Sequence, residues 1–249
     1  MTNTTVEIAG TSALSEKHQR LCVWAGLAFV PVFGAVFIFM GWLPPPSPNL
    51  GAAEIAQIFS DDRIRIRIGM YLLTFVAPLL AFFGAALTHQ CRMIVGNSPL
   101  VWVQALSAAV LTLEFLIPQM VWQTALFRTE RTPAMVQMLN DQAWLLYLGV
   151  VGTVMVQLIV LAICIFHDPR AEPLIPRWAA YLCLWVALGV SAGGLIVFTH
   201  TGPVAWNGII SWWIVVISFF VWIASMSTLM LRASHRIEDE LAVSITTDG

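Results

Sequence analysis

The chain has 249 residues, of which 59% are hydrophobic and only 10% are charged. Soluble globular domains contain about 45–50% apolar and about 25% charged residues, so this chain has too few charges to cover the surface of a water-soluble protein. The net charge of −2 also excludes the large basic surface that binds nucleic acid. The composition therefore predicts an all-α integral membrane protein whose main partner is the lipid bilayer.

Six apolar stretches are long enough to cross a membrane. A hydrocarbon core about 30 Å thick needs about 20 apolar residues in helical form. Residues 1–20 and 232–249 are polar tails, so the predicted transmembrane domain covers residues 21–231. The first span is longer than the apolar core of a signal peptide and is interpreted as retained. The predicted spans are 21–43, 68–87, 100–122, 143–166, 178–198 and 208–231.

The orientation follows from the basic residues and the cysteines. Six spans place both termini on one side of the membrane, and lysines and arginines favour the cytoplasmic side. The segments on the side of the termini carry seven of the 12 basic residues and the other segments carry five. In this orientation the cysteines lie at or near cytoplasmic span ends, where thiols stay reduced. We therefore expect cytoplasmic termini in the plasma membrane, with these thiols on the inner side: Cys22, Cys91, Cys164 and Cys183.

The longest outward loop joins the first two spans. Its proline-rich segment 44–48 must be extended, because proline excludes the residue before it from the helical region. Residues 51–60 then predict a short helix. Arginine and isoleucine alternate over residues 61–68, which is a strand period, but the segment runs directly into an apolar span. We therefore predict an early helix start here, with Ser60 or Asp61 as the N-cap.

Arg63 and Arg65 form an outer basic segment just before the second span. Arginines in this position can anchor a helix by extending their charged ends to the interface. They can also form an anion-attracting mouth or contact a partner protein, and the sequence leaves these three interpretations open.

Tryptophans cluster near the ends of the predicted spans. Their amphipathic rings prefer the interface between membrane and water, so we interpret them as interfacial anchors. The tryptophans in question are Trp24, Trp42, Trp102, Trp122, Trp144, Trp178 and Trp206.

Glu114 is the ionisable residue that lies well inside a predicted span, about 12 Å from its outer end. A buried charge in a membrane costs several kcal/mol, which makes this residue a functional candidate. The alternative is a structural hydrogen bond between helices. In the functional interpretation Glu114 belongs to an outward-facing polar cavity, which is also lined by Arg67, Tyr71, Thr74, Gln119 and Tyr147.

Gly189 and Gly193 frame a segment that matches both a nucleophile-elbow pattern and a small-residue packing motif. The elbow requires a strand–turn–helix context, whereas this segment lies in the middle of a span and has no histidine at its depth. Helix packing is therefore the predicted role. Gly149 and Gly152 are expected to pack in the same way on the fourth span.

Two pairs of residues suggest a zinc site, namely His89 with Cys91 and Cys164 with His167. Their spacing differs from that of known zinc fingers, and the ligands would have to converge through packing alone. We therefore expect neither a metal nor a cofactor.

These observations favour a small permease or ligand-binding membrane component with an outward-facing polar cavity. A non-catalytic accessory subunit of a larger membrane complex is the first alternative, and it would use the glycines and tryptophans as partner surfaces, either for a second copy or for another protein. An intramembrane enzyme is the second alternative, but the sequence shows no catalytic set. The small-molecule ligand is not identified by any motif.

Overall fold

The computed structural model describes residues 2–247, with side chains described for residues 17–236. All regular elements in this part of the chain are helical. They are α1 (Thr2–Met40), α2 (Ala52–Asp61), α3 (Arg63–Val76), α4 (Leu79–Val95), α5 (Pro99–Phe127), α6 (Pro133–Leu148), α7 (Gly152–Phe166), α8 (Trp178–Ser191), the 3-10 segment η1 (Ala192–Phe198), the π-helical segment η2 (Ile209–Ile214) and α9 (Val215–Thr247).

Six helical stretches in the described residues are long and apolar enough to cross a membrane, which confirms the predicted number. Several extend beyond the predicted limits, because amphipathic turns continue the helices at the span ends. The stretches are Lys17–Met40, Arg63–Val95, Pro99–Phe127, Pro133–Phe166, Trp178–Phe198 and Ile209–Arg236.

The second and fourth stretches are interrupted. The second breaks between α3 and α4 at Pro78, which has no backbone N–H and cannot continue the hydrogen-bond ladder. The fourth breaks between α6 and α7 at residues 149–151. Pro31 and Pro118, by contrast, lie within the continuous helices α1 and α5.

The loop before the second span contains the expected short helix, α2. Its first turn is stabilised by the Gly51 backbone N–H, which donates to the Glu54 carboxylate at 2.7 Å. The alternating segment is helical from Arg63 onward, so the helical prediction is confirmed over the strand pattern. The residue that precedes α3 is Asp62, whereas Ser60 and Asp61 were predicted as caps and lie inside or at the end of α2.

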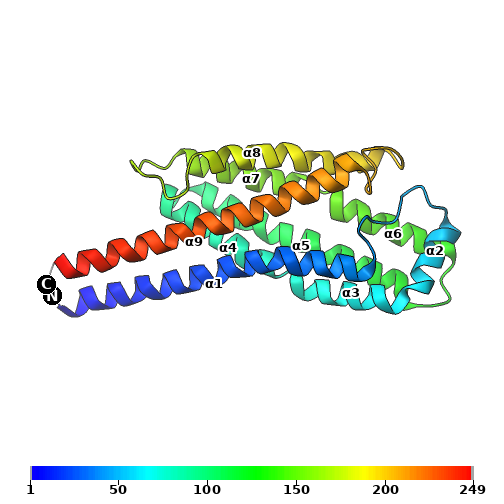
Figure 1. Ribbon diagram of the computed structural model, residues 1–249, viewed down its shortest axis with the longest axis horizontal. Helices are drawn as coiled ribbons and strands as arrows, with labels where there is room; N and C mark the ends of the chain where they lie inside the picture. Colours follow the sequence, from blue (N-terminus) through cyan, green and yellow to red (C-terminus); the bar gives the residue numbers. More distant parts are fainter. Residues whose placement is uncertain (1, 248–249) are drawn as a thin grey trace.

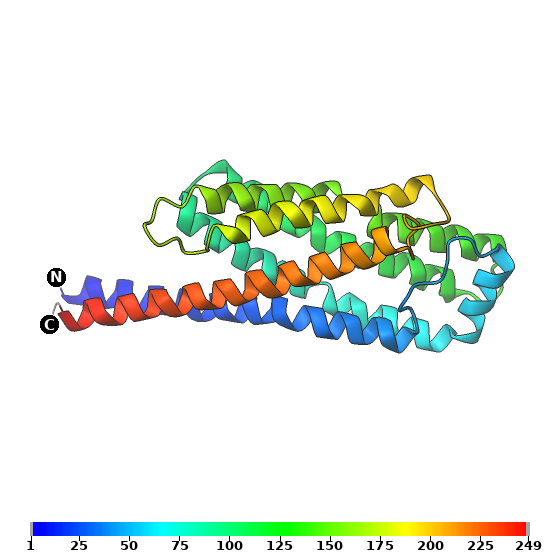
Figure 2. The ribbon, with the colours of Figure 1, turned by 45° about the horizontal axis from the view of Figure 1, so that its top comes forward.

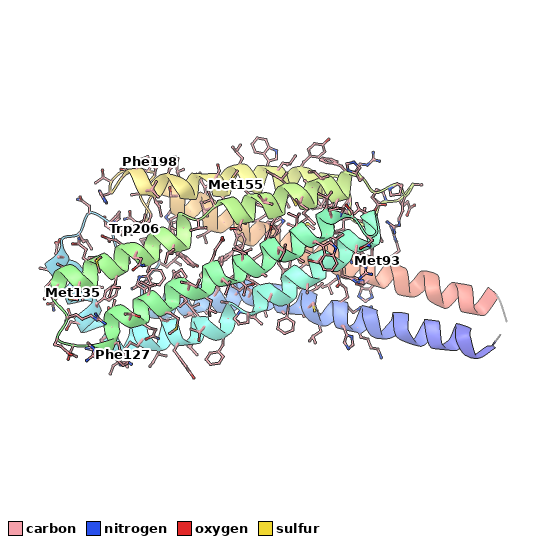
Figure 3. All side chains as sticks on the ribbon, turned by 180° about the vertical axis from the view of Figure 1, so that it is seen from behind. Met93, Phe127, Met135, Met155, Phe198 and Trp206 are labelled. Carbon is pink, nitrogen blue, oxygen red and sulfur yellow. The ribbon has the colours of Figure 1, made fainter. Side chains whose placement is uncertain are left out.

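The bundle is elongated, and the start of α1 and the end of α9 lie at the same end of it, where these two helices run side by side (Figures 1 and 2). We call this the terminal end. Helix α2 lies at the opposite end, which we call the α2 end. Figure 3 shows Met93 towards the terminal end, and Phe127 and Met135 at the α2 end.

A buried carboxylate fastens the loop between α7 and α8 at the terminal end. Asp168 accepts hydrogen bonds from the Leu174 backbone N–H at 2.9 Å and from the Arg170 guanidinium at 2.9 Å. The same guanidinium donates to the carbonyl of Met93 in α4 at 3.0 Å. Burial by itself would raise the pKa of Asp168, but the hydrogen bonds from Leu174 and Arg170 and the Arg170 charge outweigh it and hold the pKa below its ordinary value.

Candidate functional site

Glu114 lies in the middle of α5 and faces the start of α7, where the Thr153 hydroxyl donates a hydrogen bond to its carboxylate. The side chain is half-buried. Because α7 begins at Gly152, Thr153 stands in the first turn of that helix. The interruption of the fourth span therefore places a helix N-terminus beside the buried carboxylate.

The N-terminus of α7 has no side-chain cap of its own. The first amide N–H groups of a helix have no acceptor within the helix, and together they carry a partial positive charge. A negative group beside them is stabilised by that charge. The Glu114 carboxylate on the neighbouring helix α5 lies near this helix end, because it accepts a hydrogen bond from Thr153 in the first turn of α7.

A cavity of about 60 Å³ adjoins Glu114 in the centre of the bundle. A cavity needs at least about 10–15 Å³ to hold one water molecule, so this one has room for several waters or one small organic group. Its wall includes five aromatic rings contributed by α1, α5, α6 and α9, namely Phe33, Phe115, Tyr147, Phe219 and Phe220.

The rest of the cavity wall is aliphatic, and no lysine, arginine or histidine lines it. Val150, in the break between α6 and α7, belongs to the wall and is 44% exposed. The cavity therefore reaches the outer surface of the bundle at the break. The aliphatic wall residues are Leu111, Leu148, Val150, Val151, Val154, Val190, Val215 and Val216.

Tyr147 adds a second polar group to this cavity. Its ring lies 5.2 Å from that of Phe115 and 6.3 Å from that of Phe33, measured between ring centroids. Among the described side chains, the Tyr147 hydroxyl has no hydrogen-bond partner. The Tyr147 side chain is half-buried, and a ligand or water in the cavity that bonded to its hydroxyl would be stabilised by that hydrogen bond.

The six residues predicted to share one cavity occupy different places. Glu114 and Tyr147 line the same cavity. Gln119 is fully buried, and its side-chain amide donates to the Phe115 carbonyl at 3.2 Å in its own helix. Neither Gln119 nor the remaining three residues belong to the cavity wall.

Arg67, Tyr71 and Thr74 line a separate groove of about 700 Å³ on the outside of the bundle, between α3 and α5. Tyr71 is 59% exposed there, and the Thr74 hydroxyl donates to the Tyr71 carbonyl at 2.6 Å. This groove faces away from Glu114, because these residues lie on the outer face of α3. Arg65, from the basic segment, pairs with Asp62 at 2.5 Å.

Five tryptophans form a cluster between the cavity and the α2 end. The ring centroids of Trp144 and Trp122 are 4.9 Å apart, and Trp42 lies 5.2 Å from Trp122. Trp206 and Trp212 each lie 5.8 Å from Trp144. Tyr147 contacts Trp144 and Trp122 at centroid distances of 6.1 and 5.9 Å, so this tryptophan cluster borders the cavity through Tyr147.

The tryptophan cluster corrects the interfacial interpretation for four of the seven rings. Trp42, Trp122, Trp144 and Trp206 are at most 3% exposed and pack against one another inside the protein. The other three keep the exposure expected of interfacial anchors, at 59%, 65% and 53% for Trp24, Trp102 and Trp178.

Glycines fit the 3-10 segment η1 against the break in the fourth span. A Cβ atom on Gly193 would lie 2.7 Å from the Leu148 carbonyl oxygen, and one on Gly189 would lie 3.2 Å from the Ser218 hydroxyl. A Cβ on Gly149 would meet the Leu145 carbonyl oxygen at 2.4 Å. Gly152, in contrast, has open space around its Cα.

Gly193→Ala is expected to lower the free energy of unfolding by roughly 1–2 kcal/mol, because the added methyl group meets a backbone oxygen that cannot move aside cheaply. Gly152→Ala is the matched control, since its methyl group enters open space. Denaturation in detergent micelles measures both variants. Equal stability of the two would show that η1 does not pack tightly on the break.

Three buried thiols from three helices occupy the half of the bundle nearer the terminal end. Cys91 in α4, Cys164 in α7 and Cys183 in α8 are close enough for their thiols to interact electrostatically. His167 is one of the residues considered for a zinc site, and its Nδ1 atom lies 2.8 Å from the carbonyl oxygen of Ile163. In the described residues no group of three or more histidines, cysteines or acids is arranged to hold a metal ion.

The break at residues 149–151 and the role of Thr153 were missed by the sequence reasoning. The pair Gly149 and Gly152 around two β-branched valines was the available signal, because both residue types disfavour a continuous helix. No protein-family model matches this chain, and no curated protein or solved structure matches it either.

Proposed function

We propose that this protein is a small membrane permease or ligand-binding component whose ligand is a small organic cation held at Glu114. The observation that carries the proposal is the carboxylate itself. Glu114 borders a cavity whose wall is otherwise aromatic and aliphatic, and no cationic side chain lines that wall.

Simple electrostatics supports this ligand class. Burying a charged carboxylate in a membrane bundle costs free energy unless the group is protonated or paired. A cation in the cavity would therefore interact more strongly with the carboxylate than it would in water. Aromatic faces attract organic cations through their quadrupoles, and this contribution grows when water is excluded. Phe33, Phe115 and Phe219 are among the rings that line the cavity together with Glu114.

The geometry also supports access from the side of the bundle. The tryptophan cluster separates the cavity from the α2 end, whereas exposed Val150 opens the wall at the break in the fourth span. A ligand with apolar substituents can partition into the bilayer and approach by this route. We also propose that the bundle lies in the plasma membrane with cytoplasmic termini.

The interrupted helices support transport in particular. Transporters commonly place their substrate beside discontinuous helices, whose halves move relative to each other. Here the break between α6 and α7 and the transition from α8 to η1 both adjoin the cavity or its wall. A permease uses these joints for movement, whereas a static binding component does not.

Glu114→Gln tests the proposal with the whole chain in nanodiscs. Methylammonium, which is small enough for a cavity of this volume, is expected to bind the wild type in calorimetry, and the neutral amide should weaken binding about tenfold or more because it cannot pair with the cation. Glu130→Gln is the matched control, since Glu130 is exposed and lies outside the cavity wall.

Undiminished binding by Glu114→Gln, or an absence of methylammonium binding by the folded wild type, would refute the cation site. Uptake of the radiolabelled cation by proteoliposomes then separates the two forms of the proposal. Uptake that depends on Glu114 indicates a permease, whereas binding without uptake indicates a binding component.

One observation favours the accessory-subunit alternative. Because the wall is open at Val150 and Gly152 is exposed, a basic side chain from a partner helix could reach Glu114 from outside the bundle. In that case a stoichiometric partner copurifies from native membranes, and Glu114→Gln releases it.

A further inference from the structure

A second concave site lies at the α2 end, on the surface between the loop after α5 and helix α2. It is a groove of about 410 Å³ formed by α2, the first residue of α3, the end of α5 and the start of α6. Phe127 and Met135, which are labelled at this end in Figure 3, belong to the segments that flank it. It shares no wall residue with the cavity at Glu114.

Three arginines from two separate segments of the chain line this groove. Arg63 comes from the start of α3, and Arg128 and Arg131 come from the segment between α5 and α6. No aspartate or glutamate lines the groove. The groove therefore concentrates positive charge at a concave surface.

The described contacts leave much of this charge uncompensated. Arg128 meets Glu130 at 3.5 Å, but both side chains are more than 60% exposed, so the pair contributes little. Arg63 donates to the Phe127 carbonyl at 3.2 Å, which is a neutral acceptor. The Nε atom of Arg131 is buried and has no hydrogen-bond partner among the described residues.

Nearby carboxylates are engaged with other groups. Asp62 pairs with Arg65 at 2.5 Å, and Asp61 accepts from the Gln57 side chain at 2.7 Å. Ser60 also belongs to the groove wall and can supply a neutral hydroxyl donor, whereas the Gln57 amide in the same wall already donates to Asp61. A ligand with several anionic oxygens would thus meet charged and neutral donors together.

We infer that this arginine groove binds a phosphate group, either as a free phosphate or phosphomonoester or as the headgroup of an anionic phospholipid. The planar guanidinium donates two parallel hydrogen bonds to phosphate oxygens, and these charge-assisted bonds are about twice as strong as neutral ones. A phosphate can accept from several guanidinium groups at once, and all three arginines belong to the groove wall. Arg65 belongs to the same basic segment as Arg63 but is directed to Asp62.

The experiment uses the full chain in nanodiscs of phosphatidylcholine, titrated with inorganic phosphate and followed by calorimetry. A second arm uses nanodiscs that also contain phosphatidylglycerol, and native mass spectrometry measures the lipid retained by the protein. In at least one arm Arg131→Gln is expected to weaken binding at least tenfold. Arg65→Gln is the matched control and should leave binding unchanged.

The two arms identify the source of the phosphate group. Phosphate binding that depends on Arg131 indicates a soluble ligand, whereas retention of phosphatidylglycerol alone indicates a lipid headgroup. The inference is overturned if the wild type binds neither probe. It is also overturned if Arg65→Gln weakens binding as much as Arg131→Gln does. Should Arg131→Gln fail to fold, the exposed Arg128→Gln takes its place, with the same tenfold criterion and with unchanged helical circular dichroism as the check on folding.

Discussion

Trp144→Ala is expected to lower the free energy of unfolding by about 3–5 kcal/mol, the usual cost of removing a buried tryptophan. Trp144 is fully buried at the centre of the tryptophan cluster and contacts Trp42, Trp122, Trp206 and Trp212. Its loss leaves a void among rigid rings that cannot close around it. Equilibrium unfolding in mixed detergent micelles measures the change.

Trp185→Ala is the control for this result. Trp185 is 70% exposed on the outside of α8, so its removal leaves no internal void and should change stability by well under 1 kcal/mol. An equal decrease in the free energy of unfolding in Trp144→Ala and Trp185→Ala would contradict a structural role for the tryptophan cluster. Trp144→Phe should lie between alanine and the wild type, because it keeps part of the ring contact.

Asp168→Asn is expected to cost about 3 kcal/mol near neutral pH. The carboxylate accepts bonds from the Leu174 and Arg170 backbone N–H groups and from the Arg170 guanidinium, and bonds to a charged group contribute about 1.5–3 kcal/mol each. Because Arg170 is 37% exposed, solvent screens part of its contribution, so the three bonds do not add in full. Unfolding at several pH values measures the loss.

The pH dependence has a definite sign. The folded pKa of Asp168 lies below its ordinary value of about 3.9, so its contribution is fully present above about pH 4 and is lost as the pH falls through the folded pKa. The asparagine variant lacks this contribution at every pH, and its difference from the wild type should shrink in acid. Glu172→Gln is the control, since Glu172 is 89% exposed and meets Arg236 only at 3.8 Å. A difference between Asp168→Asn and the wild type that stays constant down to acid pH would contradict the proposed cause.

The number of spans was predictable because it depends on the length and hydropathy of apolar segments. The helical start at Arg63 was also predictable, since an alternating segment that continues into an apolar span has no second strand with which to pair. Both inferences use only local sequence. Neither depends on how a helix is turned about its axis.

The rotation of each helix was not predictable in the same way. In a membrane both the lipid-facing side and the protein-facing side of a helix are apolar, so hydropathy gives a weak signal of which face is inward. Tyr71 and Thr74 therefore looked equivalent to Tyr147, yet they lie on an outer groove while Tyr147 lines the cavity. For the same reason the sequence did not predict that Trp122 and Trp144 are buried inside the bundle.

The arginine groove forms through packing between helices that are far apart in the sequence. Arg63 and Arg131 are 68 positions apart, and they meet because α2 packs against α6 while α3 packs against α5. The sequence grouped Arg63 with Arg65 because they are neighbours in the chain. Residues two positions apart on a helix point in different directions, so proximity in the chain did not identify the arginines that share the groove.

The cavity wall joins the beginning of the chain to its end. Phe33 comes from the first span, while Phe219 and Phe220 come from the last. During synthesis the helices are made in order, so Glu114 and Tyr147 are made before the last part of their cavity wall. The aromatic wall around Glu114 is complete only after α9 has been synthesised and has packed beside α1, because Phe219 and Phe220 belong to α9. Closure of the cavity is thus coupled to completion of the bundle, and a chain that stalls before α9 leaves Glu114 in a cavity whose wall is incomplete.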